Sequence, residues 1–241
     1  KKKWNPGMTP YVFMERNGIH IIDLNKTVSM LDEAAAAMKQ IAKSGRSILF
    51  VATKKQAKTI VSEFAQSVNM PYITERWPGG LLTNFSTIRK SIKKMDTIDK
   101  MATDGTLDTL SKRERLQISR TREKLDRNLG SIASMNRMPS AIFIVDINKE
   151  HIAVAEAAKL GIPTFAMVDT NSDPNQISYP IPSNDDSSKS ISKIMGIVTE
   201  AVKEGLADRE QANAVKAQEK ADKKAAEAKK EESTESTEKT K

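Results

Sequence analysis

The segment Ser47-Ile-Leu-Phe-Val-Ala52 decides the fold class, because it is a short and uninterrupted apolar run. Such a run is typical of a strand that is buried on both faces of a parallel sheet. The same pattern returns in Ala141-Ile-Phe-Ile-Val145 and again over residues 164–168. Strands that alternate with helices predict an α/β fold with a parallel sheet and right-handed crossovers. The other predicted elements are brief strands at 72–74 and near Ile177, and flanking helices over 27–44, 55–69, 149–160 and 187–205.

Residues 84–135 interrupt this alternation with two apolar stripes at helical spacing. One stripe runs from Ile88 to Met101 and the other from Ile118 to Met135, with the turn signal Thr103-Asp-Gly-Thr106 between them. This pattern predicts an inserted antiparallel helical hairpin, a short coiled coil. At 1.5 Å per residue, an arm of about 20 residues would reach about 30 Å.

The chain is therefore predicted to have four parts. Residues 1–83 form the first part of the α/β domain and carry a basic N-terminal arm, and residues 84–135 form the protruding hairpin. Residues 136–208 complete the α/β domain. From about residue 209 the composition falls to Ala, Glu, Lys, Ser and Thr, so residues 209–241 are predicted to be a charged, mobile tail.

Composition excludes several classes of protein. The 241 residues include no cysteine, which excludes disulfides, Cys-ligated zinc and a thiol nucleophile. No apolar run approaches the roughly 20 residues that span a bilayer, and no signal-peptide pattern is present, so a cytosolic protein is expected. The first residue is Lys1 rather than Met, so residues upstream of it are expected to be missing.

Charge is segregated along the chain, and the net charge of +8 hides this. Residues 1–138 carry 25 basic and 13 acidic side chains, residues 139–202 carry 4 and 8, and residues 203–241 carry 10 and 10. The hairpin alone has 12 basic and 7 acidic side chains. A basic region of this size predicts a polyanionic partner, with nucleic acid as the first candidate. The alternative is a merely solvated face, or a coiled-coil handle for docking a protein.

The sequence contains no evident catalytic constellation. The loop Ala52-Thr53-Lys54-Lys55 lacks the glycines of a P-loop or a dinucleotide-binding turn. The two histidines, His20 and His151, fit structural or hydrogen-bonding roles better than general-base catalysis, and no serine has a His and Asp partner by motif. The remaining enzyme hypothesis is a Mg²⁺-dependent site on a phosphorylated substrate, formed by Asp146, Asp169 and Asp185.

Five aspartates follow the predicted strands or lie in the loops beyond them, and several are expected to gather at one edge of the sheet. Carboxylates gathered in this way can hold a hard cation. The alternative is capping, in which Asp169 caps a turn and Asp185 or Asp186 caps the helix that follows. The five are Asp146, Asp169, Asp173, Asp185 and Asp186.

Two loops combine positive charge with an aromatic ring. Residues 76–84 begin with Arg76-Trp77 and contain two glycines, which permit close backbone approach, and Trp beside Arg suits a base or ribose. The alternative is a structural turn with Trp77 packed on the sheet. The N-terminal Lys1-Lys2-Lys3-Trp4-Asn5 repeats the chemistry and is a plausible phosphate-binding arm.

The candidate RNA-binding residues come from these two loops and from the basic faces of the hairpin. They are Lys1, Lys2, Lys3, Trp4, Asn5, Arg76, Trp77, Asn84, Arg89, Lys90, Lys93, Lys94, Lys112, Arg113, Arg115, Arg120 and Arg122.

These motifs, in this order, resemble the bacterial small-subunit ribosomal protein S-two family over roughly residues 4–202. The resemblance is most specific in Gly161-Ile-Pro-Thr-Phe-Ala-Met-Val-Asp-Thr-Asn-Ser-Asp-Pro174 and Ile181-Pro-Ser-Asn-Asp-Asp186. It is also carried by Trp4-Asn-Pro6, Gly18-Ile-His20-Ile-Ile-Asp23-Leu24, Lys26-Thr27, Ile48-Leu-Phe-Val51, Thr53-Lys54, Arg76-Trp77, Gly79-Gly80-Leu-Leu-Thr-Asn84 and Pro139-Ser-Ala-Ile-Phe-Ile-Val-Asp146.

The resemblance implies a flavodoxin-like α/β domain with a protruding helical hairpin, and no catalysis. It implies a cytoplasmic protein of the ribosome that binds small-subunit rRNA between head and body, with no membrane and no small-molecule substrate. It also implies help in docking neighbouring ribosomal proteins, including the large mRNA-binding one. In some members an acidic pocket holds zinc, with carboxylates that match Asp169, Asp185 and Asp186. The family's His-containing segment upstream of Trp4 is absent from this sequence. The candidate ions are thus zinc, from the resemblance, and magnesium, from the gathered carboxylates.

Overall fold

The computed structural model describes the backbone of residues 4–238, and within that range the side chains of all residues except Asp108 and residues 216–238. The predictions made for Lys1, Lys2 and Lys3 lie outside the described residues. Within residues 4–238, no helix combines the length and the apolar character that a bilayer-spanning segment requires.

Five parallel strands form the central sheet in the described part of the chain, in the order β4-β3-β5-β6-β7. Every residue of the three inner strands is buried, as their apolar runs predict. The predicted α/β fold is therefore confirmed. The last strand begins at Tyr179 rather than near Ile177, because Ile177 still closes a short 3-10 turn over Pro174–Gln176. The strands are β3 (Ile48–Val51), β4 (Tyr72–Ile73), β5 (Ala141–Val145), β6 (Thr164–Val168) and β7 (Tyr179–Pro182).

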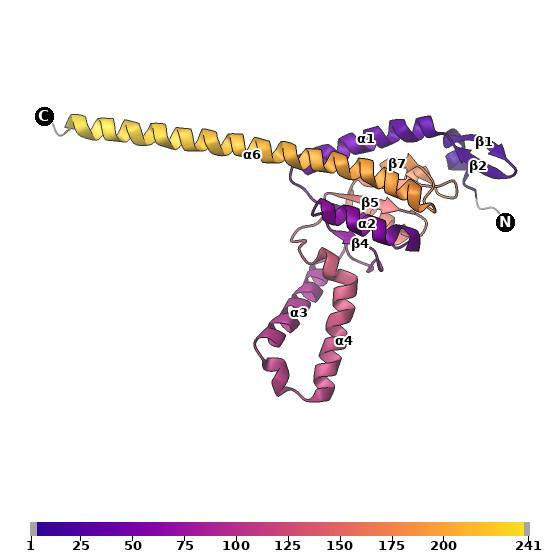
Figure 1. Ribbon diagram of the computed structural model, residues 1–241, viewed down its shortest axis with the longest axis horizontal. Coiled ribbons are helices and arrows are strands. Elements are labelled where there is room, and N and C mark those ends of the chain that lie inside the picture. Colours follow the sequence, from indigo (N-terminus) through magenta and orange to yellow (C-terminus); the bar gives the residue numbers. More distant parts are fainter. Residues whose placement is uncertain (1–3, 239–241) are drawn as a thin grey trace.

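Helices cover both faces of this sheet (Figure 1). On one face, α1 (Leu24–Lys43), α2 (Lys55–Ser67) and α6 (Ser188–Glu238) pack around the ladder of Phe50, Phe143 and Phe165. On the other face, α5 (His151–Leu160) packs together with the base of a protruding helix pair. The result is a three-layer arrangement with one core on each side of the sheet.

The protruding pair consists of α3 (Phe85–Thr103) and α4 (Lys112–Leu129), joined by a 3-10 turn over Thr106–Thr109. The two helices run in opposite directions and project from the α/β body (Figure 1). Ile92, Met95 and Ile98 of α3 are buried. A capping box formed by Ser111 and Glu114 starts α4. Two helices stand where the stripes predict them, and the coiled-coil geometry stays a prediction.

Helix α6 continues as one helix through the predicted boundary at residue 208 and extends away from the body (Figure 1). Its first half packs on α1, where Gly205 allows a close approach: a Cβ at this position would collide with the carbonyl oxygen of Lys39. Lys39 also pairs with Glu204 at 2.7 Å. The division into four parts and the mobility of the tail stay predictions.

A small antiparallel hairpin lies before α1 and was not predicted from the sequence. It pairs β1 (Val12–Arg16) with β2 (Ile19–Ile22) through a turn at Asn17-Gly18, where both residues have positive φ. Asn-Gly is the preferred dipeptide for such a turn. The hairpin leaves large apolar side chains in solvent, with Phe13 70% and Ile19 68% exposed.

Candidate nucleic-acid interface

The loop that leads from β4 into α3 is held by one buried carboxylate on α5. The Oε1 atom of Glu156 accepts hydrogen bonds from Gly80 N (2.7 Å) and Trp77 Nε1 (3.2 Å). Its Oε2 atom accepts from Leu82 N (2.9 Å), Thr83 N (3.2 Å) and Thr83 Oγ1 (3.3 Å). The side chain thus satisfies the backbone of the loop immediately before the helix pair begins.

These donors also fix the protonation state of Glu156. Burial by itself raises the pKa of this carboxyl, but the hydrogen bonds from Gly80, Trp77, Thr83 and Leu82 outweigh it and lower the pKa below its ordinary value. Glu156 is therefore ionised at neutral pH, and its charge is balanced by N–H dipoles rather than by a basic side chain.

The same geometry separates the two interpretations of the Arg76-Trp77 motif. Trp77 is only 6% exposed and lies in the core, which favours the structural alternative over stacking on a base. Gly80, at φ 82°, turns its N–H toward Glu156. Arg76 is exposed beside the buried ring, and Asn84 is exposed at the start of α3. Of the predicted loop residues, Arg76 and Asn84 stay accessible.

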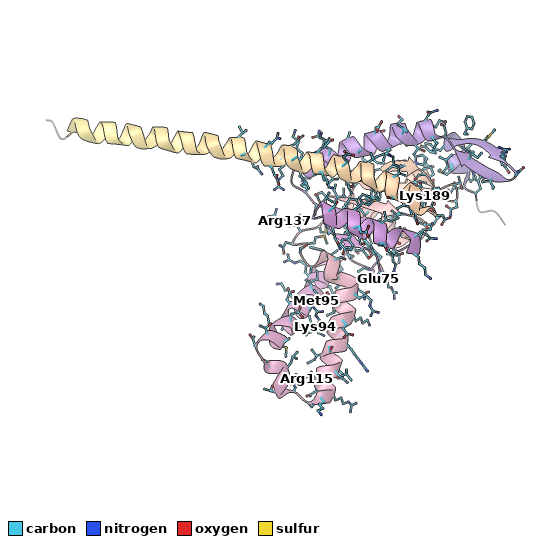
Figure 2. The ribbon with its side chains drawn as sticks, in the orientation of Figure 1. Glu75, Lys94, Met95, Arg115, Arg137 and Lys189 are labelled. Atoms are coloured by element: carbon cyan, nitrogen blue, oxygen red, sulfur yellow. The ribbon has the colours of Figure 1, made fainter. Side chains whose placement is uncertain are left out.

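Three lysines make the basic face of α3. Lys90, Lys93 and Lys94 are exposed and spaced at i, i+3 and i+4, so they share one face of the helix. They border a groove of about 750 Å³ between the two helices, whose apolar lining comes from Ile98, Met101, Leu110 and Ile118. Figure 2 shows Lys94 on α3 and Arg115 near the far end of the pair.

The basic residues of α4 fall into two groups. Lys112, Arg113 and Arg120 are exposed. Arg122 instead bridges the two helices, with Nε 2.9 Å from Asp99 and Nη1 3.4 Å from Asp126, and these partners raise its pKa. Arg115 donates from Nε to the Leu107 carbonyl at 3.1 Å.

Arg89, at the base of α3, is half-buried and donates from Nη1 to the carbonyl of Asn136 at 2.7 Å. Arg122 thus bonds α4 to α3, Arg115 bonds α4 to the connecting turn, and Arg89 bonds α3 to the segment after α4. These structural roles cannot be told from charge alone in the sequence.

The N-terminal arm places its aromatic ring on β2. Trp4 is 40% exposed and stacks on His20 with ring centroids 5.3 Å apart. Asn5 anchors the arm, since its N–H donates to the Thr170 carbonyl at 2.9 Å and its side chain accepts from Gly7 N at 2.8 Å. Trp4 thus has a face available for a partner, whereas the Asn5 side chain is used within the protein.

The predicted acidic edge exists, and Lys54 lies at its centre. Lys54 Nζ is 2.6 Å from Asp186, 2.7 Å from Asp185 and 3.3 Å from Asp146. Burial lowers the pKa of Lys54, but its hydrogen bonds to Asp185 and Asp186 raise the pKa well above its ordinary value. Burial raises the pKa of Asp185 to about 6, and the charges of Asp146 and Asp169 add to this while Lys54 opposes it.

Of the aspartates given a capping alternative, Asp169, Asp185 and Asp186, only Asp169 binds the backbone of its own turn. Asp173 and Asp146 also cap turns, Asp146 by accepting from Lys149 N at 3.1 Å. Asp169 accepts from Thr170 N at 2.6 Å, and Asp173 caps its 3-10 turn by accepting from Asn175 N at 3.1 Å. At the start of α6 the accepting group belongs to Asn184, whose Oδ1 binds the N–H groups of Asp186 and Ser187. Asp185 and Asp186 face Lys54 instead.

The carboxylates at this edge also fit a cation. One oxygen each from Asp169, Asp185 and Asp186 lies within 4.8 Å of the others. Asp185 is 2% exposed, and its Oδ2 has no hydrogen-bond partner within the described part of the chain. Because all donors here are oxygens, the set suits a hard ion such as Mg²⁺ better than zinc, which favours nitrogen and sulfur.

Two glutamates of structural importance were missed by the sequence analysis. Glu150 binds the backbone N–H of Thr53 at 3.0 Å and also its hydroxyl, and Glu156 binds the loop before α3. Both lie within the predicted helix 149–160, and both are buried. A carboxylate at an otherwise apolar helical position was the available signal, because a buried charge requires partners.

Comparison with known proteins gives one consistent family. The family model described as "Ribosomal protein S2" matches residues 1–205. A protein of Flavobacterium johnsoniae named "Small ribosomal subunit protein uS2" is 64% identical over 220 residues, which is 91% of this chain and 87% of the relative. Proteins of the same name from Parabacteroides distasonis and Porphyromonas gingivalis are each 66% identical over 209 residues, covering 87% of this chain and 75% and 74% of theirs.

The bonds to Glu156 predict a pH-dependent loss of stability. At pH 7, E156Q should lower the free energy of unfolding by about 1–3 kcal/mol, since an amide N–H₂ would face backbone donors. The folded-state pKa of Glu156 is lowered, so this contribution is present above the unfolded value of about 4.5 and is lost as pH falls below it. Urea denaturation of both proteins between pH 3 and 7 measures the difference, which should shrink below about pH 4.5. A pH-independent difference would contradict the assignment.

Proposed function

The chain belongs to the ribosomal protein S2 family, and from this premise we propose that it is a structural, RNA-binding constituent of the small ribosomal subunit in the cytoplasm. The observation that supports RNA binding best is the set of exposed basic side chains on the protruding helix pair: Lys90, Lys93, Lys94, Lys112, Arg113 and Arg120. Their role is to bind and position RNA in translation, with no catalysis.

Physical chemistry supports phosphate as the ligand of these side chains. Lysine and arginine heads that neutralise phosphates release counterions, which gives affinity that falls with salt. The helix pair is a projecting lever, so its two basic faces can contact two RNA elements at once. We place those elements on the head and body of the subunit, as the family resemblance implies. Arg76 and Asn84 at the base of the pair and Trp4 on the N-terminal arm extend the same proposed surface.

Docking of neighbouring ribosomal proteins is proposed for a different surface, formed by β1, β2 and the start of α1. Leu24 is 73% exposed and Val28 57%, and both border an apolar groove of about 550 Å³ that ends at α6. An apolar surface of this kind gains little from phosphate but suits a protein partner. The proposed occupant is another small-subunit protein, the large mRNA-binding one in the family resemblance.

A divalent cation is proposed at the acidic edge, held by Asp169, Asp185 and Asp186. The unpartnered Oδ2 of Asp185 and the oxygen-only donor set support a hard ion. Lys54 already supplies one positive charge there, so the ion would be structural and weakly held.

Charge reversal on α3 tests RNA binding. The double variant K93E/K94E should weaken binding to small subunits that have been salt-washed free of their own uS2, and it should reduce the slope of log affinity against log salt by about 2. The matched control is K189E/K203E on α6, which changes the same charge at exposed lysines away from both the helix pair and the proposed docking groove (Lys189 in Figure 2). Equal loss in both variants, or wild-type protein that fails to bind at low salt, would contradict the proposal.

A photo-crosslinker tests the docking surface. Benzoylphenylalanine placed at Val28, in protein assembled into purified small subunits, should crosslink to a ribosomal protein. The same probe at Gln66, an exposed polar position on α2, is the control. Crosslinks from Val28 to rRNA would refute protein docking there.

Calorimetric titration with MgCl₂ tests the cation site. Wild-type protein and D173N should bind about one ion per chain, whereas D169N should not, because Asp169 contributes an oxygen to the set and Asp173 caps a separate turn. No binding heat in the wild type, or equal binding by D169N, would remove the site.

A further inference from the structure

Helix α5 and the residue that precedes it supply two buried carboxylates, and each binds a different loop of the sheet. Glu150, 3% exposed, binds the loop after β3 through the N–H and hydroxyl of Thr53. Glu156, 8% exposed, binds the loop after β4 through donors of residues 77–83. Only the second loop leads into the helix pair.

We propose that Glu156 is a positioning residue for the RNA-binding surface, since its carboxylate sets the direction in which α3 leaves the α/β body. The inference rests on the proposed function and deepens it. Glu156 is buried and is not expected to touch RNA itself. It acts through the loop that it orders, and through that loop on the basic faces of α3 and α4.

The contacts of Glu156 lie directly at the N-terminal base of α3. The last residue bound by Glu156 is Thr83, and α3 begins at Phe85, so a single residue separates them. Leu81 and Leu82, the second of which is also a bound donor, are 0% and 1% exposed and pack in the core, which fixes the loop to the sheet. Loss of a hydrogen bond to Glu156 should therefore change the position of the first turn of α3.

Because α3 is long, a small change in its tilt at the base becomes a large displacement of its far end. The 19 residues of α3 extend about 28 Å at 1.5 Å per residue. A tilt of about 10° at the base would move the tip by about 5 Å, further than a lysine–phosphate hydrogen bond tolerates. An ordered root therefore preorganises the basic face, which spares the ordering cost on binding.

The hydrogen bonds of the Glu156 carboxylate can be tested with one nearly isosteric substitution. A carboxylate presents only acceptors, and backbone N–H groups face both of its oxygens. E156Q is almost isosteric but turns one oxygen into an N–H₂ that opposes a donor. E150Q makes the same change, also at a buried carboxylate, but at the loop that does not lead to α3. Because Thr53 donates only to Oε1 of Glu150, the amide oxygen of E150Q can keep both bonds, so E150Q is the control for loss of a buried negative charge at α5.

The cysteine-free sequence allows a direct measurement of helix-pair orientation. Spin labels at two introduced cysteines, A102C near the tip of α3 and S67C at the end of α2, report one distance by pulsed electron resonance. Both positions are exposed. The distance distribution should broaden or shift in E156Q and keep the wild-type form in E150Q. T83A, which removes only the Oγ1 donor of an exposed residue, should give a smaller change of the same kind and serves if E156Q does not fold.

Binding to the salt-washed small subunits is the second readout. E156Q should bind about tenfold more weakly than wild type, and E150Q within about twofold of it. An unchanged distance distribution in folded E156Q, or equal loss of affinity in E150Q, would overturn the positioning role. Wild-type protein that fails to bind would instead sink the proposed function, while the distance measurement would still decide whether Glu156 orients the helices.

Discussion

The arrangement of the candidate RNA surface is set by the hydrogen bonds between the buried carboxylate of Glu156 and the loop before α3. A charge with 8% exposure is unfavourable unless donors replace its water, and here the N–H groups of Gly80, Leu82 and Thr83 do so. These bonds hold the loop of residues 77–83, which has no regular secondary structure, in a single conformation. The direction of helix α3 is set by that loop, because α3 follows it directly. Helix α4 is in turn held against α3 by the bond between Arg122 and Asp99.

The sequence predicts best those features that depend on local pattern. The buried strands β3, β5 and β6 are readable because an apolar run of four or five residues specifies burial on both faces without reference to any partner. The stripes of the helix pair are readable for the same reason. The β1–β2 hairpin was missed although Asn17-Gly18 is a turn signal, since the apolar run Val12-Phe13-Met14 of β1 does not alternate with polar residues.

Hydrogen-bond and ion-pair partners that are distant in the sequence could not be predicted from local sequence patterns. Glu156 and Gly80 are 76 positions apart, and Lys54 and Asp185 are 131 apart. The sequence left Trp77 between a stacking and a packing role, and only its burial decides for packing. In the same way, Arg89 and Arg122 look equivalent to Lys93 in sequence, but their guanidinium groups bind Asn136 and Asp99. Charge was predictable, whereas the availability of that charge was not.

The exposed basic faces of α3 and α4 are proposed to contact ribosomal RNA. The most direct measurement is ultraviolet crosslinking of purified small subunits that contain this protein, followed by mass spectrometry of peptides that carry a nucleotide. Adducts are expected on peptides that contain Lys93 and Lys94 of α3 and Arg113 of α4. Adducts confined to α6 or to the β1–β2 hairpin, with none on the helix pair, would contradict it.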